Sequence, residues 1–228
     1  MHFSPTVMFI LSALAIIPLA GIMGEATEEI SFYSGPRVGG FLNATFGNAT
    51  ELIIAFFAMQ AGLFDVVKAS IAGSVIGNIL LVLGASMLMG GMKFKSQTFN
   101  KQSIEVSSSM LLFAVIGLTV PAIFTHTVAA DLLNTRYEGL SITVAVIMFA
   151  IYLMSLYFSF YTHKDIYSAV PEEEATPKWS LNKAIAVLIG ATVLIGIESE
   201  MFVGAVEPMT EAIGLSEFFV GIILVPII

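Results

Sequence analysis

Glu51 is an acidic residue in the middle of a long apolar stretch, and its position needs a chemical explanation. No other charged residue lies between Arg37 and Asp65. If the stretch crosses a membrane, a charged side chain near its centre costs about 2.5 kcal/mol or more. A residue kept at such a cost is expected to have a partner or a function.

Residues that supply oxygen ligands and loosen a helix come directly before Glu51. Asn43 carries an amide, and Gly47 and Asn48 both weaken a helix where they stand. A loosened turn exposes carbonyl oxygens, which can bind an ion inside a membrane protein. Glu51 follows Asn48 by three residues and shares its helix face. We interpret this pattern as a cation site; the alternative is that these polar groups join helices by hydrogen bonds.

The following apolar stretch contains a second polar pair. Ser74 and Asn78 are four residues apart and therefore face the same way on a helix. A short turn near residues 63–67 would make the two stretches antiparallel neighbours, with Asn78 at the depth of Glu51. We expect Ser74 and Asn78 to complete the ligand set. The alternative is a packing motif, because Gly73 and Gly77 permit close helix approach.

Composition indicates a membrane protein built only of α-helices. The chain is 57% hydrophobic and 11% charged, with a mean hydropathy of +0.93, whereas a soluble domain is about 25% charged. Apolar stretches long enough to span a bilayer recur along the chain. We predict spans at residues 4–24, 38–62, 68–91, 105–125, 139–161 and 182–206, and a seventh beginning near residue 215. The expected surroundings are a lipid bilayer.

Several classes of function are disfavoured. The chain has no cysteine, which rules out a disulfide or a thiolate metal site. Its net charge of −8 argues against a nucleic-acid partner. We find no nucleophile motif, phosphate loop or dinucleotide fingerprint, so we expect neither an enzyme nor a bound cofactor.

The basic residues fall mostly in alternate loops, which predicts the orientation of the chain. The positive-inside rule places the richer set in the cytoplasm; this set is Arg37, Lys93, Lys95, Lys101, Lys164, Lys178 and Lys183. Residues 162–181 then form a cytoplasmic linker that carries the acidic run Glu172–Glu174. Compact loops and the lack of cysteine favour a prokaryotic cell membrane, or the vacuolar membrane in a eukaryote.

Acidic residues gather near the ends of two predicted spans. We expect them to attract cations towards the membrane by local potential; solvated loops are the alternative. Glu198 and Glu200 fall within the sixth span, where they could relay protons or mark a water-filled cavity. The set comprises Glu25, Glu28 and Glu29 after the first span, Glu198 and Glu200, and Glu207, Glu211 and Glu217 after the sixth.

Five predicted spans precede the linker, so a second copy of this unit would enter the membrane upside down. A shift of 182 residues aligns Glu29 with Glu211 and Gly39 with Gly221. Inverted repeats with helices broken at the midplane are a common transporter architecture. We predict a first repeat at residues 1–161, a linker at 162–181 and the opening of a second repeat at 182–228. The remainder of that repeat is expected to follow Ile228.

The segments around these residues resemble the CAX family of Ca²⁺/H⁺ antiporters, which belongs to the cation/Ca²⁺ exchanger superfamily. The likeness extends over essentially the whole chain and is most specific in the Gly-Asn-x-x-Glu segment. It is carried by Ile17–Ala20, Gly24–Glu28, Gly39–Ile53, Gly73–Ser74 and Asn78–Gly84. The family's second Gly-Asn-x-x-Glu motif does not occur among these residues and, by the family pattern, should begin directly after Ile228.

The resemblance implies exchange of Ca²⁺, or another divalent cation, for H⁺ by alternating access. Glu51 would correspond to the carboxylate that binds the ion and the proton, and Asn48, Asn43, Ser74 and Asn78 to its polar supports. The expected partners are Ca²⁺ and H⁺ as substrates and the remainder of the second repeat. A Na⁺-coupled exchanger and a non-transporting membrane subunit remain the alternatives.

Overall fold

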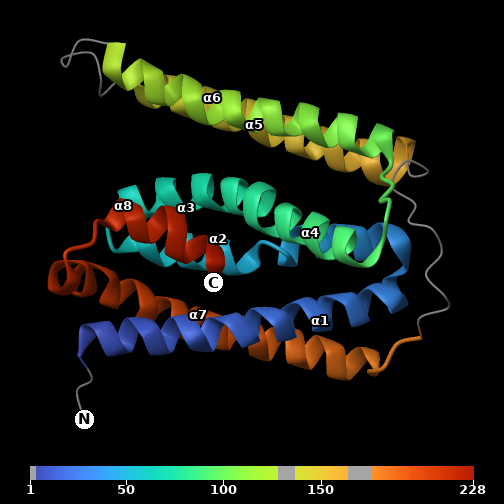
Figure 1. Cartoon of the computed structure of the whole chain (residues 1–228), viewed down its shortest axis with the longest axis horizontal. Coiled ribbons are helices and arrows are strands. Elements are labelled where there is room, and N and C mark those ends of the chain that lie inside the picture. The colour runs from blue at the N-terminus through green and yellow to red at the C-terminus, as the bar shows by residue number, and fades with distance from the viewer. Residues whose placement is uncertain (1–3, 128–136, 164–175) are drawn as a thin grey trace. The chain divides into compact units, whose positions relative to one another are not determined.

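The structure is a computed structural model that describes residues 4–127, 137–163 and 176–228, and it is helical without strands in these ranges (Figure 1). Five of the described helices are long and apolar enough to cross a membrane, and counting one bent pair of helices as a single span gives six. Each of the six complete predicted spans overlaps one of these, and the seventh, predicted to begin near residue 215, corresponds to the shorter apolar helix Glu217–Ile227. The prediction of an all-α, multi-pass membrane protein is therefore confirmed.

Helix α1 (Pro5–Phe46) begins where Ser4 caps it by accepting the N–H of Val7, and Pro5 fixes its first turn. Its regular course breaks at Gly35, whose φ of 77° favours glycine, so its first section runs from Pro5 to Gly35. This section is longer than the predicted span of residues 4–24. The expectation that Glu25, Glu28 and Glu29 follow the helix was wrong, because glutamate is a good helix former and nothing before Gly35 stops the helix.

The polypeptide bends at Gly47 and Asn48, between the end of α1 and helix α2 (Ala49–Gln60). The helical segments Val38–Phe46 and Ala49–Gln60 meet at 42°. A β-carbon at position 47 would lie 2.7 Å from the carbonyl oxygen of Asn43, so this tight approach favours glycine. The predicted loosening of the helix is therefore confirmed, and it occurs directly before Glu51.

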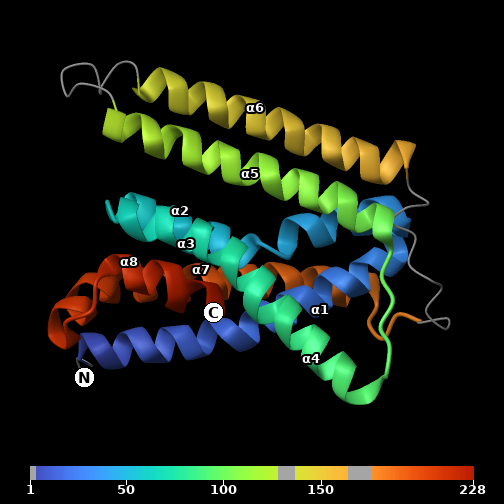
Figure 2. The ribbon, with the colours of Figure 1, turned by 45° about the horizontal axis from the view of Figure 1, so that its top comes forward.

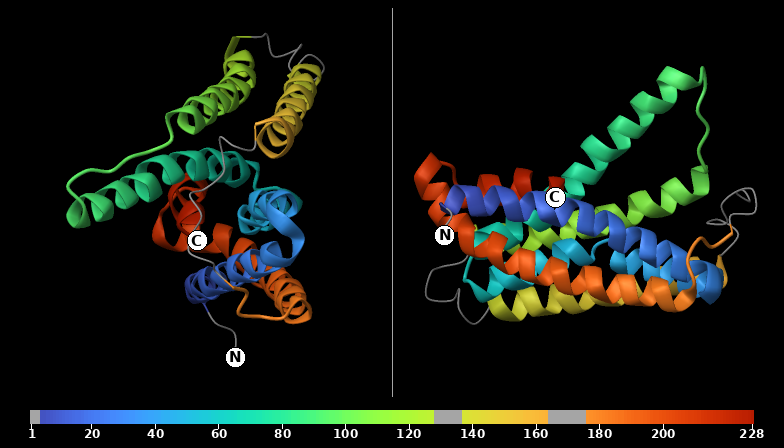
Figure 3. Two further views of the ribbon diagram at one scale, coloured as in Figure 1. Left: turned by 90° about the vertical axis from the view of Figure 1, so that its right-hand side faces the viewer. Right: turned by 90° about the horizontal axis from the view of Figure 1, so that it is seen from below.

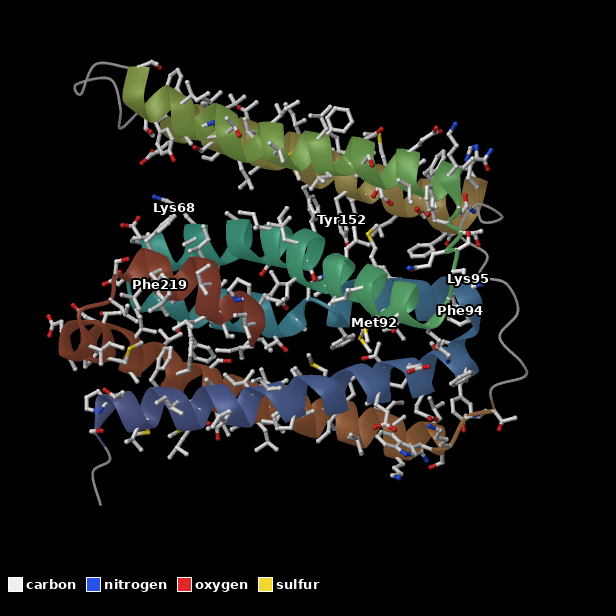
Figure 4. The ribbon with its side chains drawn as sticks, in the orientation of Figure 1. Lys68, Met92, Phe94, Lys95, Tyr152 and Phe219 are labelled. Carbon is white, nitrogen blue, oxygen red and sulfur yellow. The ribbon has the colours of Figure 1, made fainter. Side chains whose placement is uncertain are left out.

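A turn at residues 61–63 reverses the chain into a long, nearly continuous helical rod (Figure 2). The rod consists of α3 (Phe64–Gly77), the π-helical segment η1 (Asn78–Leu83) and α4 (Gly84–Lys93). Figure 4 shows Lys68 near its start and Met92, with the following Phe94 and Lys95, at its far end. The short turn makes α2 and α3 antiparallel neighbours, as predicted.

Residues 98–175 form a separate compact unit, which contains α5 (Lys101–Thr127), α6 (Glu138–Tyr157) and the short π-helical segment η4 (Phe158–Thr162). Tyr152, labelled in Figure 4, lies in the second half of α6. Within this unit α5 and α6 pack together where Gly117 leaves room for Met148, whose Sδ would lie 2.8 Å from a β-carbon there. The acidic run Glu172–Glu174 lies outside the described residues.

Helix α7 (Leu181–Ile213) runs antiparallel to α1 along most of its length (Figures 1 and 3). The rings of Phe9 and Phe202 contact each other near one end of this pair, with centroids 4.6 Å apart and planes tilted by 31°. Towards the other end, the seam is made of small and aliphatic side chains, among them Ala26, Ile30, Ala184, Leu188 and Ala191. Small residues let the two helices approach closely in a membrane.

Helix α7 extends beyond the predicted span of residues 182–206 and ends at Gly214, whose φ is 71°. Glu207 and Glu211 therefore lie on its last turns and not in a loop, and the expectation of a loop there was wrong. Pro208 does not stop the helix, although it removes one backbone donor. Hydropathy identifies only the apolar part of a helix, which fits within the membrane. A helix that also carries polar residues can continue beyond that part.

A short helical stretch follows α7 and packs against α3 (Figure 2). It comprises α8 (Glu217–Phe219), the π-helical η6 (Val220–Leu224) and the 3₁₀ turn η7 (Val225–Ile227). A β-carbon on Gly73 would lie 2.5 Å from the carbonyl oxygen of Ile222, and one on Gly221 would lie 2.8 Å from that of Val66. The predicted close helix approach at Gly73 is confirmed.

Gly221→Ala tests this backbone contact. The added methyl would overlap Ala69 and Val66, and overpacking of this kind costs about 1–3 kcal/mol. We expect a lower Tm in detergent, measured by scanning fluorimetry, with about 2–4 °C lost per kcal/mol.

Gly204→Ala is the matched control, because a β-carbon at that position of α7 has no neighbour within 4 Å among the described atoms. We expect this variant to keep or raise the Tm. An equal loss in both variants would show that the glycines act through the helix backbone and not through the contact with α3.

Candidate functional site

Glu51 lies in the first turn of α2 and faces an open pocket of about 240 Å³ between α2 and α3. We call it the amide pocket; its polar lining residues are Asn48, Glu51, Ser70, Ser74 and Asn78. The bend at Gly47–Asn48 aims the start of α2, and the turn at residues 61–63 brings α3 alongside it. Four of the five predicted ligand residues therefore meet in one place.

The side chain of Asn48 is held by the last turn of α1. Its Nδ2 donates to the carbonyl oxygen of Ala44 at 3.3 Å, and its backbone N–H donates to that of Thr45 at 3.4 Å. With the amide nitrogen engaged in this way, Oδ1 remains the acceptor that Asn48 can offer to a cation. The residue that interrupts the helix thus also supplies an oriented oxygen.

Ser74 carries a buried hydroxyl without a partner. Its Oγ is inaccessible to solvent and forms no hydrogen bond with any described residue. A buried polar atom left unpaired costs about 1–3 kcal/mol. Ser74 also lines the amide pocket beside Glu51, so its hydroxyl is a candidate cation ligand.

Asn78 stands where α3 changes from α-helical to π-helical geometry, at the first residue of η1. A π-helical turn leaves backbone carbonyls less regularly paired, and such turns occur frequently at functional sites. Ser70, Ser74 and Asn78 are spaced by four residues and form one polar stripe on this rod. The sequence analysis missed Ser70, which the same spacing would have identified.

Asn43 is not among the residues that line the amide pocket. It lies one turn before the bend, where its carbonyl oxygen accepts the N–H of Gly47 at 2.9 Å, and its side chain is exposed. A bend of 42° follows between Phe46 and Ala49, and the pocket-lining residues of α2 lie beyond it. The structure thus separates Asn43 from the other four predicted ligands.

Glu51 also lines a second pocket, of about 290 Å³, on the side of α1. Ala20, Met23 and Gly24 of α1 contribute to it, as do Gly47, Thr50 and the last residues of the chain, Pro226–Ile228. Thr50 is a further polar lining residue that the sequence analysis missed, although it is adjacent to Glu51. The carboxylate therefore lines two pockets, one beside α3 and one beside α1.

The acidic residues expected to guide cations have different surroundings. Glu25, Glu28, Glu200, Glu207 and Glu211 are exposed, and Glu198 and Glu217 are half-buried. Glu29 is buried, and its carboxylate accepts hydrogen bonds from backbone N–H groups before α7. In the described ranges no three carboxylate or imidazole side chains cluster closely enough to hold a metal ion, so here Glu51 stands as a single carboxylate among neutral oxygens.

Comparison with known proteins gives a consistent family. Residues 4–161 match the model of the sodium/calcium exchanger protein family. The chain is 42% identical to the Ca²⁺/H⁺ antiporter ChaA of Bacillus subtilis and 40% identical to a Ca²⁺/H⁺ antiporter of Aphanothece halophytica, in each case over all of this chain and 65% of the relative. It is 37% identical to vacuolar cation/proton exchanger 2 of rice, over 97% of this chain and 53% of that protein.

The fold has a counterpart of known structure. The structure of native YfkE superposes on 99% of this chain with a TM-score of 0.81 at 37% identity, and the chain covers 62% of it. The chain thus spans somewhat less than two thirds of the length of these relatives. The family match covers more than half of the chain, and the chain belongs to the sodium/calcium exchanger protein family.

Proposed function

We propose that the protein formed by this chain exchanges Ca²⁺ for H⁺ across a membrane by alternating access. The observation that carries the proposal is the amide pocket, in which Glu51, Asn48, Ser74 and Asn78 converge on one space inside a membrane-spanning bundle. The relatives named as Ca²⁺/H⁺ antiporters support the choice of ions.

The ligand set suits Ca²⁺ better than a transition metal. Ca²⁺ takes six to eight oxygen ligands at about 2.3–2.6 Å and accepts carboxylate, amide, hydroxyl and carbonyl oxygens together. Glu51 offers one or two, and Asn48, Ser74 and Asn78 offer one each. Backbone carbonyls at the bend before α2 and water would complete the shell.

Charge balance calls for a second carboxylate. Glu51 alone leaves a divalent ion with one uncompensated charge in a low-dielectric site, which is costly. A glutamate from the remainder of an inverted second repeat would neutralise it. When the ion leaves, the two carboxylates repel each other and are poorly solvated, so protons replace the ion. Two protons and one Ca²⁺ then compete for the same oxygens, which is the basis of exchange.

The chain's own organisation supports the proposed repeat boundaries of residues 1–161, 162–181 and 182–228. Helices α1 and α7 run in opposite directions, and the first section of α1 ends at Gly35 as α7 ends at Gly214, both with positive φ. A shorter helical segment follows in each case. In the proposed cycle α1 and α7 move, and access to Glu51 alternates between the two sides of the membrane.

A sodium-coupled exchanger is the second candidate, because the matching family model is that of the sodium/calcium exchanger proteins. Its carboxylate would exchange Ca²⁺ for Na⁺ and not for protons. The amide pocket has no feature that selects between these two counter-ions. The relatives' names favour the proton.

Glu51→Gln should abolish exchange. The substitution keeps the size of the side chain but removes the charge that holds Ca²⁺ and the oxygen that accepts the proton. Ca²⁺ uptake into proteoliposomes driven by a pH gradient should fall to the level of protein-free vesicles, while the Tm in detergent stays close to that of the unaltered protein. Glu138→Gln, which neutralises an exposed residue at the start of α6, is the control and should transport normally.

Replacing the driving ion separates the two candidates. With vesicles that contain Ca²⁺ on one side, we expect a pH gradient alone to drive flux and a Na⁺ gradient at constant pH to drive none. The measurement is Ca²⁺ flux with an internal indicator, with nigericin or monensin collapsing each gradient in turn. Flux driven by Na⁺ and unaffected by the pH gradient would contradict the proposal.

Ser74→Ala should stabilise the ion-free protein and weaken Ca²⁺ binding. The variant removes a buried hydroxyl without a partner, which relieves about 1 kcal/mol or more of desolvation cost. The same change deletes one neutral ligand, for which we expect a loss of about two- to tenfold in affinity. The Tm measured across a Ca²⁺ titration reports both effects.

The control for Ser74→Ala is Ser86→Ala, three turns further along the same rod and outside the amide pocket. The hydroxyl of Ser86 is exposed and donates to the carbonyl oxygen of Val82. We expect its removal to leave the Ca²⁺-dependent rise in Tm unchanged. A Ser74→Ala variant that binds Ca²⁺ as the unaltered protein does would remove Ser74 from the ligand set.

A further inference from the structure

A buried carboxylate outside the amide pocket joins the two longest helices. Glu29 of α1 is only 4% exposed. Its Oε2 accepts the backbone N–H of Lys178 and that of Trp179, both at 2.9 Å, and its Oε1 lies 3.2 Å from the N–H of Lys178. These amides come directly before Ser180, the N-cap of α7. A residue of α1 thus binds the chain where the linker ends.

A second bond one turn further along α1 strengthens this junction. The hydroxyl of Tyr33 donates to the carbonyl oxygen of Trp179 at 2.6 Å. The indole of Trp179 also lies against a cation, because Lys183 Nζ is 4.5 Å from the ring centroid. We call Glu29, Tyr33, Lys178 and Trp179 the α1–α7 clamp. It fixes both the N–H and the C=O of Trp179, so the start of α7 has one position along α1.

The carboxylate of Glu29 is surrounded by backbone N–H donors. It forms no ion pair with any described residue. Hydrogen bonds to an ionised acceptor are roughly twice as strong as neutral ones. The amides also stand at the N-terminal end of a helix of 33 residues, where a negative charge is favoured. Loss of the charge would therefore loosen the junction even if the side chain kept its shape.

The clamp lies close to the wall of the second pocket. Gly24 and Met23 line that pocket together with Glu51, and they precede Glu29 on the same helix by five and six residues, or about 7.5–9 Å along the axis. No break in α1 separates them, because its regular course holds until Gly35. A shift at the start of α7 is thus transmitted through the clamp to the wall beside Glu51.

We propose that Glu29 is a positioning residue for exchange: through the α1–α7 clamp it makes the start of α7 and the α1 wall of the second pocket move as one body. The inference rests on the proposed exchange at Glu51. Glu29 touches neither the amide pocket nor the second pocket, so the clamp acts on the rate of opening and not on the affinity of the ion ligands.

Glu29→Gln tests the proposal, with Glu138→Gln as the control. The glutamine keeps one acceptor oxygen but turns an NH₂ group towards backbone donors, so it cannot reproduce the bonds of the carboxylate. Glu138 is exposed and its carboxylate forms no hydrogen bond or ion pair with a described residue, so its substitution removes an equal charge and leaves the clamp intact. Full-length protein in proteoliposomes should show a several-fold lower maximal Ca²⁺ flux with an unchanged KM in Glu29→Gln, and normal flux in Glu138→Gln.

Trp179 provides a direct reading of the clamp. With 5-fluorotryptophan incorporated, its ¹⁹F resonance is assigned by its loss in Trp179→Phe. We expect Glu29→Gln to shift or broaden this resonance and Glu138→Gln to leave it in place. A shifted resonance with normal maximal flux would overturn the positioning role, and so would a raised KM at unchanged maximal flux, because Glu29 would then act on ion access.

Two further variants keep the outcome decisive. If Glu29→Gln does not fold, Tyr33→Phe removes one bond of the clamp while the carboxylate remains; a smaller loss of maximal flux is expected, and no loss would overturn the proposal. If the unaltered protein exchanges no Ca²⁺ for H⁺, the proposed function fails by itself. The clamp is then judged by thiol labelling of Gly24→Cys in a cysteine-free background: Glu29→Gln should change the labelling rate, and an unchanged rate would overturn the inference.

Discussion

The position of one ionisable group within hydrocarbon thickness determines much of the local structure of this chain. A carboxylate at Glu51 must find oxygen ligands, a counter-charge or a proton, because the bilayer offers none. Around it the helix is broken at Gly47–Asn48, the amide of Asn48 is held in place by Ala44, and the neighbouring rod turns π-helical at Asn78. Each of these departures from regular geometry is unfavourable alone and suits the proposed cation site.

The long α1–α7 pair, in contrast to the surroundings of Glu51, is held together mainly by apolar contacts. Its seam is formed mostly by alanine and aliphatic side chains, with an aromatic contact near one end and the clamp at Glu29 near the other. A smooth apolar seam gives close packing but little directional preference in a membrane. The polar contacts at its end supply the direction, because hydrogen bonds to named backbone atoms exist in only one register.

The sequence predicted the helical class, the spans and the meeting of Glu51, Asn48, Ser74 and Asn78, since all of these follow from local spacing and hydropathy. It failed at the helix ends near Glu25–Glu29 and Glu207–Glu211, where glutamates continue a helix that hydropathy alone would end. The role of Glu29 could not be predicted, because its partners Lys178 and Trp179 are distant in sequence. Asn43 shows the same limit: a bend of 42° decides which face it shares.

The contact of Gly73 with the backbone at Ile222 has a mechanical consequence for the rod that carries Ser70, Ser74 and Asn78. Where two main chains touch, no side chain is left to flex and absorb a displacement. The rod is therefore braced by η6 through this backbone contact. In any cycle that opens and closes access to the ion, these polar side chains would stay in place while the other helices move past them.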